Sequence, residues 1–259
     1  MRVKRVEPSF NPQHLVRPRH RSTRSPPQAD EPHIQLINTT FTKQSSKMPL
    51  VFHNTYTSSV EIGLWKIEES ELWFVEQMDL FPDEEEMISK IEGHRKLEWL
   101  AGRWLLHWMS GRKIRGACLK DEFGKPYLEN SKLQISISHS RELVAVMAGP
   151  KAVGIDIQLI VPKITRLAHK FLNKKEADSI TDKHQLAMMH IYWGAKESLY
   201  KGYGRKKLEF KDHIKIDPFT FDPKGDDLKG FVEKEDYKQA YWLKYQLIKN
   251  YVLVYCMEE

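Results

Sequence analysis

Four short polar stretches of this 259-residue chain combine residue types at spacings that could support chemistry. In chain order they are Gly124-Lys125-Pro126, Ser136-Ile137-Ser138-His139-Ser140, Val153-Gly154-Ile155-Asp156-Ile157-Gln158 and Trp193-Gly194-Ala195-Lys196-Glu197-Ser198-Leu199-Tyr200-Lys201. Each stretch also has an ordinary structural explanation: a solvated turn lysine, a polar strand end, the solvent-facing side of a sheet, and a helix-stabilising ion pair. The four are therefore informative mainly in combination.

The third stretch indicates a site for a hard cation. Its alternating apolar residues predict a strand with one buried face, so Asp156 and Gln158 share the other face. The neighbouring Gly154 leaves room for something to approach that face. A carboxylate and an amide oxygen two residues apart suit Mg²⁺, which prefers oxygen ligands.

The second and fourth stretches contain groups that could meet an anion. Alternation sends Ser138 and His139 to opposite faces of a strand, unless the strand ends there and frees N–H groups, hydroxyls and the imidazole for an anion. Helical spacing places Trp193, Glu197 and Lys201 on one stripe of a helix. A Ser-His-Asp hydrolase is disfavoured, because Ser138 and His139 are neighbours in an extended segment and the sequence has no Gly-x-Ser-x-Gly motif.

The elements that must position these stretches are a mixture of strands and helices. We expect strands at residues 60–67, 133–138, 143–148 and 152–158, and a terminal hairpin of residues 240–248 and 251–256 around Lys249-Asn250. We expect a helix beginning at Pro82, where the acids that follow suit a first turn, and helices over residues 95–109, 166–180 and 185–202. Strands and helices do not alternate regularly, so the fold class is α+β.

Composition and charge exclude several classes of protein. A hydrophobic content of 41% is enough for a buried core, and the longest apolar runs are far shorter than the roughly 20 residues that cross a bilayer. Two cysteines are too few for a disulfide framework or a cysteine zinc site, and they favour a reducing, cytoplasmic location. The net charge of +6 resides in residues 1–47, which hold nine Lys/Arg and three Asp/Glu, so 32 residues of each sign remain in the body. We therefore do not expect nucleic acid as a partner of this neutral body.

Residues 1–47 form a basic segment with six of the 13 prolines and no sustained hydrophobic period. Such a segment cannot bury enough apolar surface to order itself, so we expect it to be disordered. Three interpretations stay open: an arm that binds nucleic acid or another anion, a targeting extension, or a segment upstream of a true start at Met48. We favour the third, because hydrophobic periodicity begins at Met48.

Taken together, the four stretches resemble the 4′-phosphopantetheinyl transferase superfamily, in particular the larger monomeric type that activates peptide and polyketide synthetases. The family pattern of Gly-Lys-Pro, Ser-His-Ser, Gly-Ile-Asp-Ile, Phe with a following Glu, and Trp-x-x-Lys-Glu-Ser-x-x-Lys is matched from Gly124 to Lys201. Weaker likeness extends to Met48 and to the C-terminus. The resemblance implies a monomer of two similar α+β halves, residues 48–151 and 152–259, in pseudo-twofold arrangement with the active site in the cleft between them.

The resemblance also implies a reaction. Such enzymes move 4′-phosphopantetheine from coenzyme A to a serine of an apo acyl or peptidyl carrier protein, with Mg²⁺, and release adenosine 3′,5′-bisphosphate. Asp156 and Glu197 would be the metal ligands, and Glu197, directly or through water, would be the base that deprotonates the serine. Lys201 would face the pyrophosphate.

The remaining matched residues are implied to contact coenzyme A or to support the site. Ser138 and His139 would hold its phosphates, and Lys125 would lie beside its nucleotide end. Arg103 occupies the place of an arginine that meets the 3′-phosphate, and Glu176 matches a family acid for which we expect a supporting role.

One departure from the family pattern concerns the metal. Where many members have a second acid two residues after the strand aspartate, this chain has Gln158, which can offer a neutral oxygen as a further metal ligand or leave the position to water. Two other functions stay open. A noncatalytic module for coenzyme A or a carrier protein would bind without turnover, and a nucleic-acid binder acting through the basic segment would gain affinity steeply at low salt.

Overall fold

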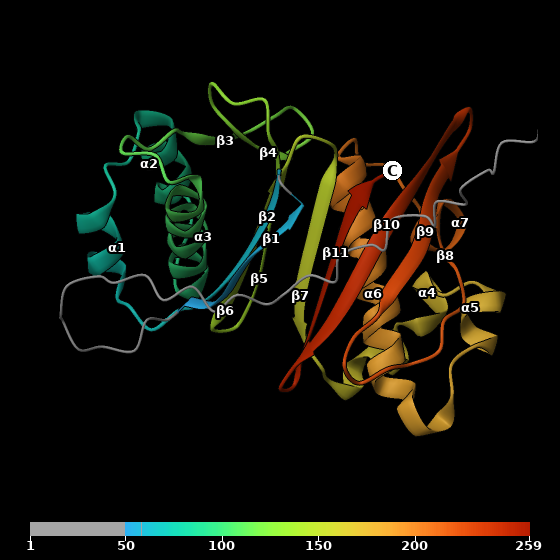
Figure 1. Cartoon of the computed structure of the whole chain (residues 1–259). Helices are drawn as coiled ribbons and strands as arrows, with labels where there is room; N and C mark the ends of the chain where they lie inside the picture. The colour runs from blue at the N-terminus through green and yellow to red at the C-terminus, as the bar shows by residue number, and fades with distance from the viewer. Residues whose placement is uncertain (1–49, 58) are drawn as a thin grey trace, which may run out of the picture. The chain divides into compact units, whose positions relative to one another are not determined.

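Two antiparallel sheets with helices on their outer faces make up the computed structural model, which describes residues 50–57 and 59–259 (Figure 1). The described residues belong to one compact unit of the chain. The segment of residues 1–47, its expected disorder and the start expected at Met48 lie outside the described residues.

The first sheet has six strands in the order β1-β2-β6-β5-β4-β3. Its strands are β1 (Leu50–Thr57), β2 (Val60–Lys66), β3 (Cys118–Lys120), β4 (Pro126–Leu128), β5 (Gln134–Ser140) and β6 (Leu143–Gly149). Side chains alternate along β6, so that Val144 and Val146 enter one apolar cluster while Ala145 and Met147 enter another. Both faces of this central strand are consequently buried.

The second sheet has five strands in the order β7-β11-β10-β9-β8. Its strands are β7 (Val153–Leu159), β8 (Ile214–Ile216), β9 (Asp227–Lys234), β10 (Tyr237–Ile248) and β11 (Tyr251–Glu258). Strands β10 and β11 form the expected terminal hairpin, in which Ile248 lies opposite Tyr251.

Seven α-helices and two 3-10 turns belong to the described part of the chain. They are α1 (Glu71–Gln77), α2 (Pro82–Ser89), α3 (His94–Ser110), η1 (Pro162–Arg166), α4 (Ala168–Phe171), α5 (Lys174–Asp178), η2 (Asp182–His184), α6 (Gln185–Tyr203) and α7 (Phe210–His213). The local sequence explains several helix ends. Ser70 caps α1 by accepting from the N–H of Trp73, and Pro82 begins α2, where its missing N–H is not needed. None of these helices is long and apolar enough to cross a membrane.

Helices and sheets pack in four layers. Helix α3 and one face of the first sheet share an apolar cluster that includes Leu105 and Val146. The opposite face of that sheet packs on the second sheet, where Met147 and Ile155 belong to a common cluster. Helix α6 covers the far face of the second sheet, and its Leu199 is part of the third cluster. Figure 1 shows α3 and α6 on the outer sides of the paired sheets.

A row of serines on β5 binds the free edge of the second sheet. Strand β7 lies at the end of its sheet, so alternate N–H groups would lack a strand partner. The N–H groups of residues 155, 157 and 159 instead donate to the Oγ atoms of Ser136, Ser138 and Ser140 at 3.0, 3.2 and 3.2 Å. This serine ladder (Ser136, Ser138 and Ser140) joins the two sheets through side chains.

The α+β class and most of the expected elements are confirmed. Strands β2, β5, β6 and β7, helices α3 and α6, and the terminal hairpin begin and end within three residues of the predicted positions. The short strands β3, β4 and β8, and also β1 and β9, were not predicted. The pseudo-twofold relation of the two halves and the domain boundary after residue 151 stay predictions.

The expectation of one helix over residues 166–180 is wrong. The segment breaks at Leu172, whose backbone is extended, and a new helix, α5, begins after Asn173. Asn173 Oδ1 accepts from the N–H of Glu176 at 3.0 Å, which is an N-cap bond. Apolar periodicity did not reveal the break, because Phe171 at the end of α4 and Leu172 at the break itself are both buried.

Candidate active site

The two elements at the centre of the candidate site, β7 and α6, are in direct backbone contact. A Cβ atom at Gly154 would lie 1.8 Å from the carbonyl oxygen of Ser198, so only glycine permits this approach. The space beside Gly154 that the sequence suggested for a ligand is therefore occupied by α6. This contact brings Asp156 of β7 opposite Lys201 of α6.

Asp156, Lys201 and Ser138 form a buried, hydrogen-bonded centre. Lys201 Nζ donates to Asp156 Oδ1 at 2.8 Å, to Ser138 Oγ at 2.9 Å and to the carbonyl oxygen of Ile155 at 2.9 Å. Ser138 Oγ in turn donates to Asp156 Oδ1 at 3.0 Å. Asp156 and Ser138 are almost wholly buried, so these charge-assisted bonds are shielded from water. Three elements that are distant in sequence thus meet at one carboxylate.

Glu197 lies beside this centre without a hydrogen-bond donor among the described residues. Burial, and then the negative charge of Asp156, raise the pKa of Glu197 to about 7 against the opposing effect of Lys201. A carboxylate with a pKa near neutrality exchanges a proton readily at physiological pH. Its position and titration therefore suit a general base.

A cavity of about 750 Å³ adjoins this centre and has a predominantly cationic wall. The charged and imidazole side chains of the wall are Lys90, Glu92, Arg95, Glu98, Arg103, Lys120, His139 and Lys201. Trp99 and Ile137 add apolar surface. A concave wall with this excess of positive charge attracts polyanions, and its apolar patches suit a ligand with a ring or chain.

Strand alternation sends Ser138 and His139 to opposite sides of β5, as the sequence predicts. Ser138 points to Asp156, whereas His139 points to α3 and forms an ion-pair contact with the buried carboxylate of Glu98. His139 also lines the cavity and is exposed there, while Ser138 is buried. Of the two residues expected at the phosphates, only His139 is open to the cavity, and the phosphate contacts of both stay predictions.

Arg103 is held within the cavity wall by neighbours of its own. Its guanidinium stacks 3.3 Å from the ring centroid of Trp99 and donates to the carbonyl oxygen of Cys118 at 3.1 Å. Its Nε lies 3.5 Å from Oε1 of the buried Glu84. Burial lowers the pKa of Arg103 to about 10. Contact of Arg103 with a 3′-phosphate stays a prediction, and Arg95 is a more accessible cation of the same wall.

Lys125 is anchored to the end of α6. The turn before it is built around Asp121, whose Oδ1 accepts from the N–H of Lys125 at 2.8 Å, and Gly124 has a φ of 82°. Lys125 Nζ donates to the carbonyl oxygen of Gly202 at 2.9 Å, and burial lowers its pKa. Lys125 also lines a cavity of about 200 Å³ that shares four lining residues with the larger one. It is therefore well placed beside a ligand that extends between the two cavities.

Gln158 turns its amide nitrogen toward Asp156, with Nε2 at 3.2 Å from Oδ2. Its amide oxygen faces His190 of α6. Burial lowers the pKa of His190, so the neutral imidazole is favoured. An oxygen ligand from Gln158 to a metal stays a prediction, and the observed orientation does not present that oxygen to Asp156.

Glu176 supports the fold around α6 and does not line the cavity. Its Oε2 lies 2.8 Å from Nζ of Lys196, and both side chains are fully buried. Lys196 Nζ also donates to the carbonyl oxygens of Phe210 and Ile214, and burial lowers its pKa to about 8. The pair therefore ties the segment after α6 to the core.

Asp156 and Glu197 are the residues that could hold a metal ion. The negative charge of Asp156 raises the electrostatic cost of ionising Glu197, and a cation between the two carboxylates would relieve that repulsion. The described residues contain no group of three or more His, Cys, Asp or Glu side chains that could hold a metal. Mg²⁺ nevertheless binds through one or two carboxylates with water and phosphate oxygens, so this pair fits it.

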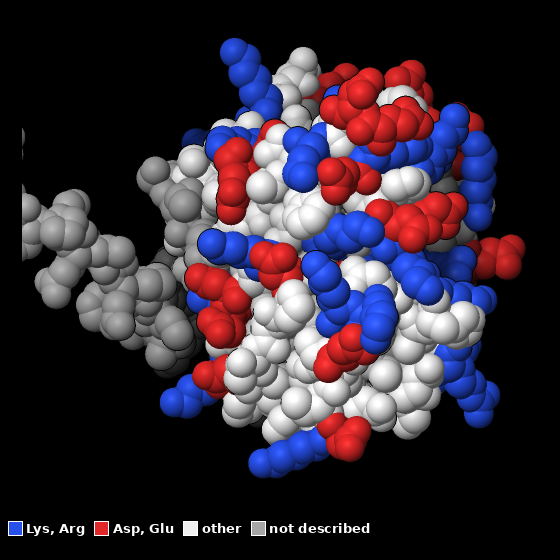
Figure 2. Space-filling model, turned by 90° about the vertical axis from the view of Figure 1, so that its right-hand side faces the viewer, with Lys and Arg blue, Asp and Glu red and all other residues white. Residues whose placement is uncertain are grey.

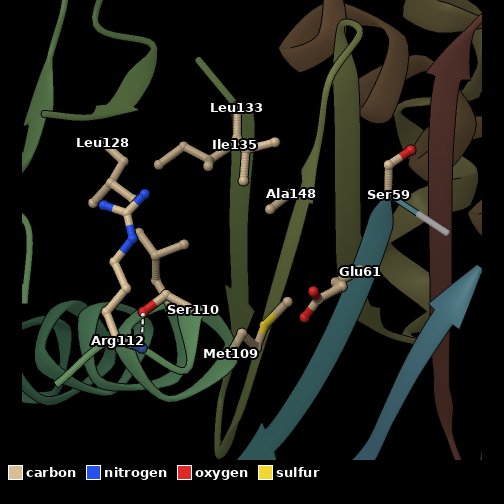
Figure 3. A pocket seen from close by; sticks show the side chains of 10 residues that line it. Ser59, Glu61, Met109, Ser110, Arg112, Leu128, Leu133, Ile135 and Ala148 are labelled. Atoms are coloured by element: carbon tan, nitrogen blue, oxygen red, sulfur yellow. Dashed lines mark hydrogen bonds between the residues drawn. The ribbon is translucent and has the colours of Figure 1, made fainter. Parts of the chain in front are cut away.

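A separate cavity of about 130 Å³ lies beside the C-terminal end of α3 (Figure 3). Its wall is mainly apolar, with Glu61 and Arg112 as the charged members. None of the site residues predicted from the sequence lines this cavity. It is therefore not part of the candidate site.

Charges on the outer surface are mixed. Figure 2 shows Lys and Arg side chains interspersed with Asp and Glu on one face of the molecule. On that face, the part of the chain that the structure describes has no continuous basic area that could follow a phosphate backbone.

Comparison with known proteins gives a family match for the part of the chain that contains β7 to β11. The family model described as the 4′-phosphopantetheinyl transferase superfamily matches residues 152–256, which include Asp156, Glu197 and Lys201. This part of the chain is similar to the 4′-phosphopantetheinyl transferase superfamily. The chain is also similar to a 4′-phosphopantetheinyl transferase of Bacillus subtilis, with 27% identity over 139 residues. That alignment covers 52% of this chain and 60% of the relative, so the chain spans about three fifths of the relative's length.

The superfamily predicted from the four polar stretches is thereby confirmed, while the larger monomeric type stays a prediction. The family match covers the Asp156 centre on β7 and α6. It does not reach the cationic wall, most of which comes from residues 90–139. The wall is therefore a feature of this structure that the match does not itself assign.

Several residues of the site were missed by the sequence analysis. Arg95 and Glu98 are three residues apart on α3 and lie outside its apolar stripe, a spacing that could have placed them together. His190 interrupts an apolar helical run, which is also a visible signal. Lys90 and Lys120 are exposed residues at element ends, and their local sequence contains no signal that distinguishes them from solvated lysines.

Proposed function

We propose that this chain transfers the 4′-phosphopantetheine group of coenzyme A to a serine of an apo acyl or peptidyl carrier protein and releases adenosine 3′,5′-bisphosphate. The observation that carries this proposal is the meeting of Asp156, Glu197 and Lys201 beside a cation-lined cavity. The match of residues 152–256 to the superfamily supports the reaction class. The cavity supports a donor that carries several phosphate groups.

The proposed position of coenzyme A follows from the charge of the cavity wall. Lys201, His139 and Arg95 are the groups we assign to its phosphates, because they combine positive charge or N–H donors with access to the cavity. We assign the nucleotide end to the smaller cavity, where Lys125 and the exposed ring of Phe123 lie together.

The proposed reaction needs no nucleophile from this chain. The carrier serine oxygen bonds to the phosphorus that bears pantetheine, the phosphorus–oxygen bond to the adenosine bisphosphate breaks, and the serine proton passes to Glu197 directly or through water. A pKa of about 7 suits Glu197 to that transfer. Lys201 compensates the charge that develops on the leaving phosphate. Mg²⁺ held by Asp156 and Glu197 would supply further neutralisation of the phosphate oxygens.

Intact mass spectrometry of several apo carrier proteins, each incubated with the chain, coenzyme A and Mg²⁺, tests the proposal. We expect one carrier or more to gain a single phosphopantetheine group, with an equal amount of adenosine 3′,5′-bisphosphate. Glu197→Gln keeps the side-chain shape but cannot accept the proton, and should be at least about 100-fold slower. Glu233→Gln, at an exposed position on β9, is the matched control. Failure to modify any carrier would contradict the proposal.

A noncatalytic binding module is the alternative that uses the same cavity. It would bind coenzyme A in a titration but leave every carrier unmodified. The raised pKa of Glu197 favours the enzyme, because a binding module gains nothing from a desolvated carboxylate without a hydrogen-bond donor.

A further inference from the structure

Gln158 and His190 form a hydrogen-bonded pair behind Asp156. Gln158 Nε2 donates to Asp156 Oδ2 at 3.2 Å and to the carbonyl oxygen of His190 at 3.1 Å. Gln158 Oε1 lies 2.8 Å from Nδ1 of the same histidine. The amide is also packed against α6, since a Cβ atom at Gly194 would lie 2.9 Å from Nε2. Both polar atoms of the Gln158 side chain therefore have hydrogen-bond partners in the protein.

These contacts fix which end of the amide faces Asp156. The carbonyl oxygen of His190 and the carboxylate of Asp156 can only accept hydrogen bonds, so the group near both must be the NH₂. Gln158 Oε1 then accepts from Nδ1–H of His190. His190 Nε2 is left without a proton and accepts from the N–H of Val161 at 2.9 Å, while the carbonyl oxygen of Val161 lies 3.1 Å from the same nitrogen.

We propose that Gln158, oriented by His190, is a positioning residue that holds the Asp156 carboxylate as a hydrogen-bond donor, in place of the metal ligand that an acid at this position would be. Rotating the amide to present its oxygen to a cation would break the three hydrogen bonds of Gln158. It would also turn the NH₂ against the Nδ1–H of His190. This proposal rests on the proposed function, because it assigns Asp156 and Glu197 as the two protein ligands of Mg²⁺.

The consequence for Asp156 is that both carboxylate oxygens are restrained. Oδ1 accepts from Ser138 and Lys201, and Oδ2 accepts from Gln158. A carboxylate held in this way keeps its orientation before a cation arrives, and loss of such a partner weakens metal binding even though the partner does not touch the metal. His190, which is almost completely buried, therefore acts on the site through Gln158.

Binding of Mn²⁺ to the full chain, followed by electron paramagnetic resonance without coenzyme A or carrier protein, tests the proposal independently of turnover. We expect Gln158→Met to weaken Mn²⁺ binding about tenfold. His190→Phe should weaken it by a similar factor, and the double variant should bind no more weakly, because the two side chains act as one unit. Gln134→Met, at an exposed glutamine of β5, is the matched control and should bind like the unmodified chain.

Two further variants separate positioning from ligation. Gln158→Glu would place a carboxylate against the carbonyl oxygen of His190, so we expect no gain in Mn²⁺ affinity, whereas a true ligand position would bind Mn²⁺ more tightly. His190→Asn can still donate to Gln158 Oε1 and should restore most of the affinity lost in His190→Phe. Tighter binding by Gln158→Glu, or unchanged binding by Gln158→Met, would overturn the proposal. If His190→Phe does not fold, the two Gln158 variants decide the question.

The outcomes also separate this inference from the proposed function. If the unmodified chain modifies a carrier while Gln158→Met binds Mn²⁺ normally, the positioning role is wrong and the transferase proposal stands. If no carrier is modified but the Gln158 and His190 variants lose Mn²⁺ together, the positioning role stands and the transferase proposal is wrong. Absence of Mn²⁺ binding by the unmodified chain would overturn the positioning role.

Discussion

The imidazole of His139 on β5 contacts the carboxylate of Glu98 on α3, with Nδ1 2.9 Å from Oε2. The Glu98 side chain is only 8% exposed, while that of His139 is 48% exposed on the cavity side. The contact is an ion pair when the imidazole is protonated, and it turns Nδ1 toward Glu98, so Nε2 is the nitrogen left for a ligand. An acidic residue within a cationic wall therefore orients one of the groups assigned to coenzyme A.

Replacing Glu98 should weaken coenzyme A binding without removing turnover. In Glu98→Ala the His139 ring loses its ion-pair partner, and we expect the KM for coenzyme A to rise about fivefold, which corresponds to about 1 kcal/mol of lost interaction. The kcat should change little. Glu98→Gln keeps an accepting oxygen, so its KM should lie between those of the unmodified chain and Glu98→Ala. Glu92→Ala removes an exposed acid of the same wall and is the control. Steady-state kinetics and calorimetry measure the effect, and tighter binding in Glu98→Ala would show that Glu98 acts only as a repulsive charge.

The stability of the metal-free chain should fall as the pH rises from about 5 to about 7. Burial and Asp156 raise the pKa of Glu197 to about 7 in the fold, while an unfolded glutamate has a pKa near about 4.3. The folded chain therefore binds more protons in this window, and ionising Glu197 costs folding free energy. Glu197→Gln should remove about 2 kcal/mol of this pH dependence.

Urea unfolding in the presence of a chelator, at pH 5, 6, 7 and 8, measures that dependence. Glu85→Gln, at an exposed position of α2, should retain the slope of the unmodified chain. A slope that persists unchanged in Glu197→Gln would mean that other groups produce it.

Breaking the Lys196–Glu176 pair should destabilise the fold strongly. Both side chains are fully buried, and Lys196→Met would leave Glu176 charged without its ammonium partner. Loss of one member of a buried ion pair costs about 3–5 kcal/mol. Lys174→Ala removes an exposed partner of Asp178 and should cost less than about 1 kcal/mol. Denaturant unfolding of both variants makes the comparison, and equal stability would contradict the structural role given to the buried pair.

Ser136→Ala should destabilise the contact between the two sheets. The hydroxyl of Ser136 accepts from the buried N–H of Ile155 at 3.0 Å, and alanine leaves that donor without a partner. We expect a loss of about 1–3 kcal/mol in the free energy of unfolding. Ser110→Ala removes an exposed hydroxyl at the end of α3 and serves as the control. If the two substitutions cost the same, the serine ladder does not stabilise the edge of β7.

Local sequence was sufficient to predict the elements and the residue types at the centre of the site. Alternation along residues 153–158 and helical spacing along residues 193–201 depend on neighbours in the chain, and both patterns are present as β7 and α6. The family pattern added the assignment of Asp156, Glu197 and Lys201 to one place, and the structure brings Asp156 and Lys201 to a distance of 2.8 Å.

Only the tertiary structure determines which polar side chains form ion pairs and hydrogen bonds with one another. Glu84 reads as a first-turn acid of α2, yet it is buried and pairs with Arg115, 31 residues away. The family resemblance implied that Ser138 contacts a phosphate, yet its hydroxyl forms hydrogen bonds with the backbone of β7 and with Asp156. The sequence suggested that Gln158 offers its amide oxygen to a metal, yet its contacts with His190 turn the amide nitrogen toward Asp156. Periodicity specifies the face of an element on which a residue lies, but the partner it meets depends on how whole elements pack, and in a desolvated interior each polar atom is restricted to the partners that packing provides.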